Sequence, residues 1–143
     1  MDTTNSGRLN GAKVILFIGE RLLVLRRDDF AHIEWPDMLD LPGGGADAGE
    51  TAEVCAIRET QEEVGLVLCS NDFVWKRRYK GAAGYSVFFA AHLPRAAERK
   101  IVFGDEGQGW MLMPPLDFVQ HPEAVPGFGA RVLEYLEEKD GKN

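Results

Sequence analysis

This sequence is poor in cysteine, in long apolar runs and in positive charge. It has two cysteines, Cys55 and Cys69, in 143 residues, and no run approaches the roughly 20 consecutive apolar residues that a transmembrane helix needs. Residues 1–10 are polar and contain no apolar signal-peptide core. Two thiols without a secretion signal are typical of a reduced, cytoplasmic protein. We therefore expect no disulfide, no membrane partner and a cytoplasmic location.

Acidic residues outnumber basic ones by 23 to 16, which gives a formal net charge of −7 at pH 7. Nonspecific binding to nucleic acid needs a basic surface, so this balance argues against a nucleic-acid partner. It does not argue against a phosphorylated small molecule, because a bound metal ion can screen such a substrate from an acidic site. The chain length and the 45% hydrophobic content fit one globular domain.

Several common catalytic motifs are also missing. The glycine-rich stretch 42–45 lacks the Lys-Ser/Thr pair of a P-loop, and the chain has no dinucleotide fingerprint and no Ser-His-Asp arrangement. His32, His92 and His121 show no metal-ligand spacing. We therefore interpret all three histidines as structural or surface residues.

Acidic side chains do recur at an informative spacing in the middle of the chain. Residues 58–66 read Arg-Glu-Thr-Gln-Glu-Glu-Val-Gly-Leu. Glu59, Glu62 and Glu63 fall at i, i+3 and i+4, so a helix would place their carboxylates on one face. Like charges placed in this way repel by about 0.2–0.5 kcal/mol per pair. A bound Mg²⁺ or Mn²⁺ would turn this repulsion into coordination, since both ions prefer oxygen ligands.

This run and the glycine-rich turn before it resemble the signature box of the Nudix hydrolases. The matching positions are Gly44, Glu50, Arg58, Glu59, Glu62, Glu63, Gly65 and the apolar Leu66. One position departs from the pattern: Thr60 stands where the family usually has an aliphatic residue. Its methyl group still suits a half-buried site. The resemblance implies an α/β (α+β) Nudix fold, a mixed β-sheet sandwiched between helices. We expect this single domain over residues 11–143, after a disordered arm at 1–10.

The resemblance also implies roles for individual residues. Glu59, Glu62 and Glu63 would ligate Mg²⁺ or Mn²⁺, and a backbone carbonyl near Gly43 or Gly44 would join them, because glycine lets the backbone approach closely. Arg58 would orient a box glutamate, either Glu50 or Glu59, through an ion pair. Glu59 or Glu106 would act as the general base.

Two further candidates lie outside the box. Glu106 belongs to the stretch Asp-Glu-Gly-Gln-Gly-Trp at 105–110, which is similar to an acidic stretch of Nudix enzymes that clean up nucleotide pools. There the acid serves as an extra metal ligand or as the base; the alternative is an ordinary acidic loop. Arg26 and Arg27 end a predicted strand, and Arg27 matches a position that often contacts substrate phosphates, which guanidinium groups suit. The alternative is an exposed strand end.

The function implied is metal-dependent hydrolysis of the pyrophosphate bond in a nucleoside diphosphate linked to another moiety. Within the family the chain is most similar to MutT-type nucleoside triphosphate pyrophosphohydrolases. Some of those read the base with an asparagine before the final helix, where this chain has no amide side chain in residues 122–126. The alternatives are hydrolysis of a dinucleoside polyphosphate or nucleotide sugar, and a nucleotide sensor without turnover. The resemblance also admits a homodimer.

Periodicity and turn residues predict the order of the elements. Apolar runs predict strands at 12–18, 21–26, 39–41, 66–68, 73–79, 85–93 and 109–113. The box helix is expected to begin near 49–51 and to end at Val64, because Gly65 suits a left-handed C-terminal cap. A second helix is expected at 128–138. Trp35, Tyr79, Tyr85 and Phe128 could stack on a base, although such aromatics more often pack in cores or loops.

Overall fold

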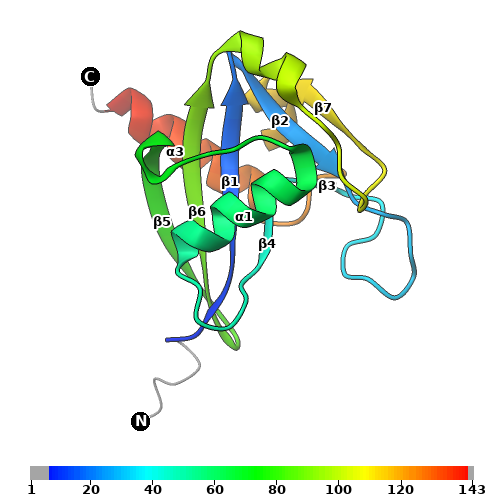
Figure 1. Cartoon of the computed structure of the whole chain (residues 1–143), viewed down its shortest axis with the longest axis vertical. Helices are drawn as coiled ribbons and strands as arrows, with labels where there is room; N and C mark the ends of the chain where they lie inside the picture. The colour runs from blue at the N-terminus through cyan, green and yellow to red at the C-terminus, as the bar shows by residue number, and fades with distance from the viewer. Residues whose placement is uncertain (1–6, 142–143) are drawn as a thin grey trace.

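A computed structural model describes residues 7–141. Its centre is a seven-stranded mixed sheet with the order β3-β2-β1-β6-β5, in which β4 pairs with β1 and β7 pairs with β2 (Figure 1). The strands are β1 (Leu9–Ile18), β2 (Arg21–Arg26), β3 (Leu39–Asp40), β4 (Gly43–Gly45), β5 (Phe73–Gly81), β6 (Gly84–Leu93) and β7 (Gly109–Met113). The helices are α1 (Ala52–Val64), α2 (Pro115–Val119) and α3 (Phe128–Gly141), with 3₁₀ turns η1 (Ser70–Asp72) and η2 (Arg95–Lys100).

Helices cover the sheet on both faces, which confirms the predicted sandwich. β1 is buried on both sides from Val14 to Ile18, so its alternate residues need two separate apolar layers. One layer packs Val14 and Leu16 against α1, and the other packs Ile15 and Phe17 against α2 and α3. In Figure 1, α1 crosses in front of the sheet and α3 lies behind it.

The box helix α1 begins and ends where local signals place it. The Thr51 side chain caps its first turn by accepting a hydrogen bond from the Val54 amide at 3.1 Å. Gly65 ends it with a φ of 73°, and its amide donates to the Gln61 carbonyl at 2.9 Å. The two caps thereby fix α1 as one rigid helix, which holds the like-charged glutamates of the box close together.

Two sequence predictions differ from the structure, and one helix was not predicted. Residues 66–68 form no strand: Leu66 and Leu68 are apolar because they pack into the α1 layer, without a partner strand. The predicted disordered arm is wrong at its end, since β1 begins at Leu9, which pairs with Tyr85 of β6. Residues 1–6 of that arm lie outside the described residues. The short helix α2 was not expected.

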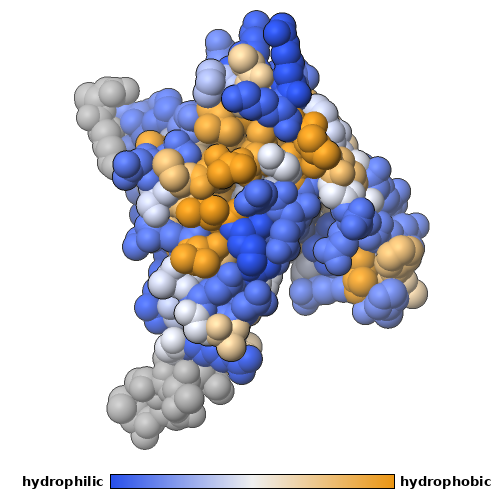
Figure 2. Space-filling model, in the orientation of Figure 1, coloured by the Kyte–Doolittle hydropathy of each residue, from blue (hydrophilic) through white to orange (hydrophobic). Residues whose placement is uncertain are grey.

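The surface of the α1 layer is partly apolar. Figure 2 shows hydrophobic side chains gathered on this side of the molecule with hydrophilic ones beside them. Val54, Val67 and Val102 are exposed by more than half, and Val102 lies beside Gly65 at the end of α1. No helix within residues 7–141 has the length and apolar character needed to cross a bilayer. The homodimer stays a prediction.

Candidate active site

Arg58 binds three of the box carboxylates at once. Its Nε and Nη2 atoms donate to the two Glu50 oxygens at 2.6 and 2.9 Å. Its Nη1 atom donates to Glu59 at 3.0 Å and to Glu62 at 3.3 Å, and Nη2 also reaches the Gly45 carbonyl at 3.0 Å. The sequence left open whether Glu50 or Glu59 is the partner, and the structure forms both pairs. A planar guanidinium can do this because its five donors point in fixed directions.

The acidic residues of the site have opposite electrostatic environments. The hydrogen bonds from Arg58, helped by the Asp47 amide, lower the pKa of Glu50 to about 2. Burial instead raises the pKa of Glu59, against the opposing effect of Arg58. Burial also raises the pKa of Glu63 to about 8, although Lys13 and the Gly43 amide act in the opposite direction. The carboxyls of Glu59 and Glu63 are therefore poorly hydrated, and a bound cation would stabilise their ionised forms.

The glycine turn lies directly against these two carboxyls. The Gly43 amide donates to Glu63 Oε1 at 2.8 Å, and Gly43 has a φ of 130°, which side chains rarely allow. A Cβ atom on Gly44 would lie 2.4 Å from Glu59 Oε1. The glycine at position 44 is thus explained by the close approach of Glu59. The Glu62 carboxylate is more open, with 58% of its side chain exposed.

Glu106, from the loop before β7, lies beside the glutamates of α1. It lines an open pocket of about 390 Å³ together with Asp105 and the three helix glutamates. Its loop is held by the Gly107 amide, which donates to Asp28 at 2.9 Å, and by Gln108, which donates to the Arg27 carbonyl at 2.7 Å. The structure therefore brings Glu106 together with Glu59, Glu62 and Glu63, as the resemblance implied.

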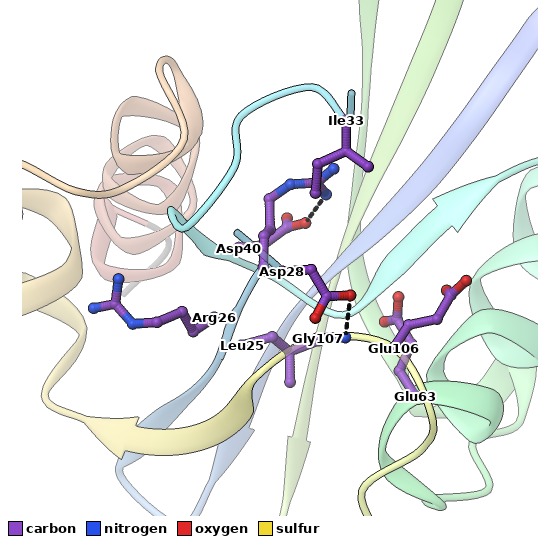
Figure 3. A pocket seen from close by; sticks show the side chains of 9 residues that line it. Leu25, Arg26, Asp28, Ile33, Asp40, Glu63, Glu106 and Gly107 are labelled. Carbon is purple, nitrogen blue, oxygen red and sulfur yellow. Dashed lines mark hydrogen bonds and ion pairs between the residues drawn. The ribbon is translucent and has the colours of Figure 1, made fainter. Parts of the chain in front are cut away.

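A second pocket of about 200 Å³ shares Glu63 and Glu106 and extends to the end of β2 (Figure 3). Arg27 lies in its wall, where Nη1 donates to Asp40 at 2.9 Å and Nε donates to the Glu34 carbonyl at 2.9 Å. Arg26 points away from both glutamates in Figure 3. It binds Glu123 at 2.7 Å and the Asp37 carbonyl at 2.8 Å, so it fastens the loop between β2 and β3.

Sequence reasoning missed an ion pair that supports the turn. Lys13 of β1 donates to Asp40 at 3.2 Å, to the Leu41 carbonyl at 3.2 Å and to the Gly43 carbonyl at 2.9 Å. Asp40 is only 5% exposed. A charge inside an otherwise apolar strand was the available signal for Lys13, because buried lysines are almost always paired.

The donor set fits a hard divalent cation. It consists of carboxylate oxygens, which Mg²⁺ and Mn²⁺ prefer. The cradle at Gly44 admits Glu59 only because no Cβ is present. Within residues 7–141 no three side chains already converge as a ready metal cage, since Arg58 and the Gly43 amide hold the carboxylates. The two turn carbonyls are also engaged, Gly43 by Lys13 and Gly44 by the Cys55 thiol at 3.4 Å. The glutamates Glu59, Glu62, Glu63 and Glu106 are the residues that would hold the ion.

A family model for the NUDIX domain matches residues 7–136, which include every residue of this site. The chain belongs to the NUDIX domain family. The enzyme class expected from the sequence, a Nudix pyrophosphohydrolase, is thereby confirmed. No curated protein matches the chain significantly in sequence.

Solved structures share the Nudix fold at low sequence identity. A MutT protein from Methanosarcina mazei Go1 matches with a TM-score of 0.73 and 15% identity, over 93% of this chain and 96% of that one. An Ap4A hydrolase from C. elegans matches with a TM-score of 0.69 and 17% identity, over 92% and 97%. The E. coli dihydroneopterin triphosphate pyrophosphohydrolase matches with a TM-score of 0.66 and 20% identity, over 91% and 95%. At these identities the matches establish the fold.

Proposed function

We propose that this Nudix domain hydrolyses a nucleoside triphosphate to the monophosphate and pyrophosphate, as a MutT-type pyrophosphohydrolase. The observation that carries the proposal is the pocket in which Glu106 meets the three glutamates of α1. The shared fold of proteins named as a MutT protein and a triphosphate pyrophosphohydrolase supports the triphosphate as substrate. The second pocket, which shares Glu63 and Glu106 with the first, provides space for the phosphate chain.

In this proposal each residue has a distinct role. Glu59, Glu62, Glu63 and Glu106 hold Mg²⁺ or Mn²⁺, which when bound polarises phosphoryl oxygens and lowers the pKa of a water molecule. Arg58 keeps Glu59 and Glu62 aligned on α1. Glu59 or Glu106 accepts the proton of the attacking water. Arg27, in the wall of the second pocket, turns from Asp40 to the substrate phosphates, for which its guanidinium is suited.

The test is release of pyrophosphate or phosphate from a panel of nucleotides, with Mg²⁺ and then with Mn²⁺. The panel contains canonical and oxidised triphosphates, ADP-ribose and a dinucleoside polyphosphate. Glu62→Gln is the site variant, and Glu137→Gln, on the exposed side of α3, is the matched control. We expect metal-dependent turnover of a triphosphate that Glu62→Gln lowers at least about a hundredfold and the control leaves unchanged. Nucleotide binding without any turnover would instead favour a sensor.

A further inference from the structure

Three charged side chains from separate segments meet beside the glycine turn. They are Lys13 of β1, Asp40 of β3 and Arg27, which follows β2. The Asp40 carboxylate accepts hydrogen bonds from Lys13 Nζ at 3.2 Å and from Arg27 Nη1 at 2.9 Å (Figure 3). It also accepts one from the Leu41 amide at 2.7 Å. Because Asp40 is only 5% exposed, these partners replace the water that an ionised carboxylate would otherwise bind.

Arg27 can bind a phosphate only by leaving this arrangement. Its Nε atom donates to the carbonyls of Glu34 and Trp35, at 2.9 and 3.1 Å, which are neutral groups of an exposed loop. Its bond to Asp40 is charge-assisted and is therefore the most costly of the three to break. A buried carboxylate that loses its one cation is strongly destabilised. The departure of Arg27 would be unfavourable if Asp40 had no second cation.

Lys13 supplies this second cation. Its side chain is 16% exposed, and Nζ also donates to the carbonyls of Leu41 and Gly43, at 3.2 and 2.9 Å. These bonds hold the ammonium group against Asp40 independently of Arg27. The Arg27 side chain is more accessible, at 28% exposed, and it lines the second pocket together with Asp40. Of the two cations, Arg27 is thus the one that an anion in this pocket can reach.

We propose that Asp40 and Lys13 are positioning residues for Arg27. Asp40 holds the guanidinium in the wall of the second pocket, and Lys13 keeps Asp40 paired when the guanidinium moves to a phosphate group. A phosphate can compete with Asp40 for Arg27, since both present oxygen acceptors that match the guanidinium fork. This inference rests on the proposed function, in which the phosphate chain of the substrate occupies the second pocket.

The experiment measures binding of an inorganic triphosphate with nitrogen bridges, which resists hydrolysis, by calorimetry in Mg²⁺. The proteins are the wild type, Arg27→Met, Lys13→Met, Asp40→Asn and the double variant Lys13→Met/Asp40→Asn. Asparagine keeps an acceptor for the Leu41 amide but carries no charge to hold Arg27. Lys100→Met, at an exposed lysine of η2, is the matched control.

The effect of removing Lys13 should depend on Asp40. We expect Lys13→Met and Arg27→Met each to weaken triphosphate binding by about tenfold or more, because in the first the guanidinium stays on Asp40 and in the second it is absent. Asp40→Asn should bind at least as tightly as the wild type. The double variant should remain within about twofold of Asp40→Asn, since Lys13 then has no charge to balance. Lys100→Met should bind like the wild type.

A different pattern overturns the inference. If Lys13→Met weakens binding equally in both backgrounds, Lys13 attracts the phosphate directly or only supports the turn. The inference also fails if Lys13→Met has no effect, if Asp40→Asn binds more weakly than the wild type, or if the wild type does not bind the triphosphate. Thermal unfolding verifies that each variant is folded. Should Lys13→Met fail to fold, the double variant decides, because it contains no unpaired buried charge.

The proposed function is tested separately by turnover of nucleoside triphosphates and its loss in Glu62→Gln. The expected binding pattern without any turnover supports the roles of Lys13 and Asp40 and contradicts the proposed function. Turnover that depends on Glu62, with equal losses on removing Lys13 in both backgrounds, keeps the proposed function and overturns these roles.

Discussion

Glu63 is an acid kept away from water beside a backbone amide. Its pKa of about 8 lies above the ordinary value of 4.5, so folding takes up a proton between these two pH values. Stability associated with this group is complete below pH 4.5 and is lost as the pH rises through about 8. Ionised Glu63 is also the form that would bind the proposed cation, so affinity for a divalent ion should rise over the same interval.

We predict that Glu63→Gln stabilises the metal-free protein at pH 7.5 by about 1–3 kcal/mol, because glutamine needs no proton to be neutral. The variant should also show a smaller loss of stability between pH 5 and pH 8. Thermal unfolding in EDTA across this range measures both effects, with Glu137→Gln as the control. Identical pH profiles for wild type and Glu63→Gln would contradict the prediction.

The burial of Thr60 is greater than expected, since the sequence suggested a half-buried site. It is fully buried, and its hydroxyl has no hydrogen-bond partner among the described residues. We predict that Thr60→Val stabilises the protein by about 1 kcal/mol, since it replaces an unpaired buried hydroxyl by a methyl group. Chemical denaturation measures the change. Thr60→Ser, which keeps the hydroxyl and loses the methyl, should destabilise; a destabilised Thr60→Val would show that the hydroxyl is satisfied.

At the scale of the element, β4 and α1 approach so closely that one methyl group matters. In Gly44→Ala the new Cβ would overlap the Glu59 carboxylate, whereas in Gly45→Ala the nearest atom to the Cβ lies 3.8 Å away. We predict that Gly44→Ala lowers kcat/KM by about tenfold or more, since small displacements of catalytic groups are costly. Gly45→Ala should retain most of its activity. Steady-state kinetics on the two variants, with circular dichroism to verify folding, makes the comparison, and equal losses would argue against it.

Elements with local determinants were predictable from the sequence. Thr51, Gly65 and the glutamate spacing lie within or beside α1, so the helix, its ends and its acidic face all follow from neighbouring residues. The start of β1 at Leu9 did not follow, because its partner in β6 is distant in sequence. The apolar run at 66–68 was misinterpreted as a strand because burial alone does not distinguish a packed loop from a paired strand.

The same distinction applies to the site. The clustering of the glutamates of α1 could be inferred from spacing, and the roles of Arg58 and Glu106 from the resemblance. Lys13 and Asp40 could not, because a pair separated by 27 positions is recognisable only when the sheet brings it together.

At the scale of the whole molecule, metal binding should be coupled to folding. The proposed ligands come from α1 and from the loop before β7, so an unfolded chain cannot present them together. We predict that Mg²⁺ or Mn²⁺ at a hundred times its Kd stabilises the wild type by about 2.7 kcal/mol. Thermal unfolding with and without EDTA measures this gain. Glu59→Gln and Glu62→Gln should reduce it, and a gain of equal size in both variants would place the ion elsewhere.

The parallel pairing of β1 with β6 also determines when the protein can assemble. Among the described elements β1 is synthesised before the others, yet its longest partner strand follows only after β2, β3, β4, α1 and β5. Contacts so distant in sequence form slowly, because a long loop must close before they contribute. Until residue 93 has been synthesised, β1, whose residues Val14 to Ile18 are all buried in the folded protein, has one unpaired edge, which is a template for aggregation. A nascent Nudix chain of this topology should therefore depend on chaperones chiefly between the synthesis of β1 and the synthesis of β6.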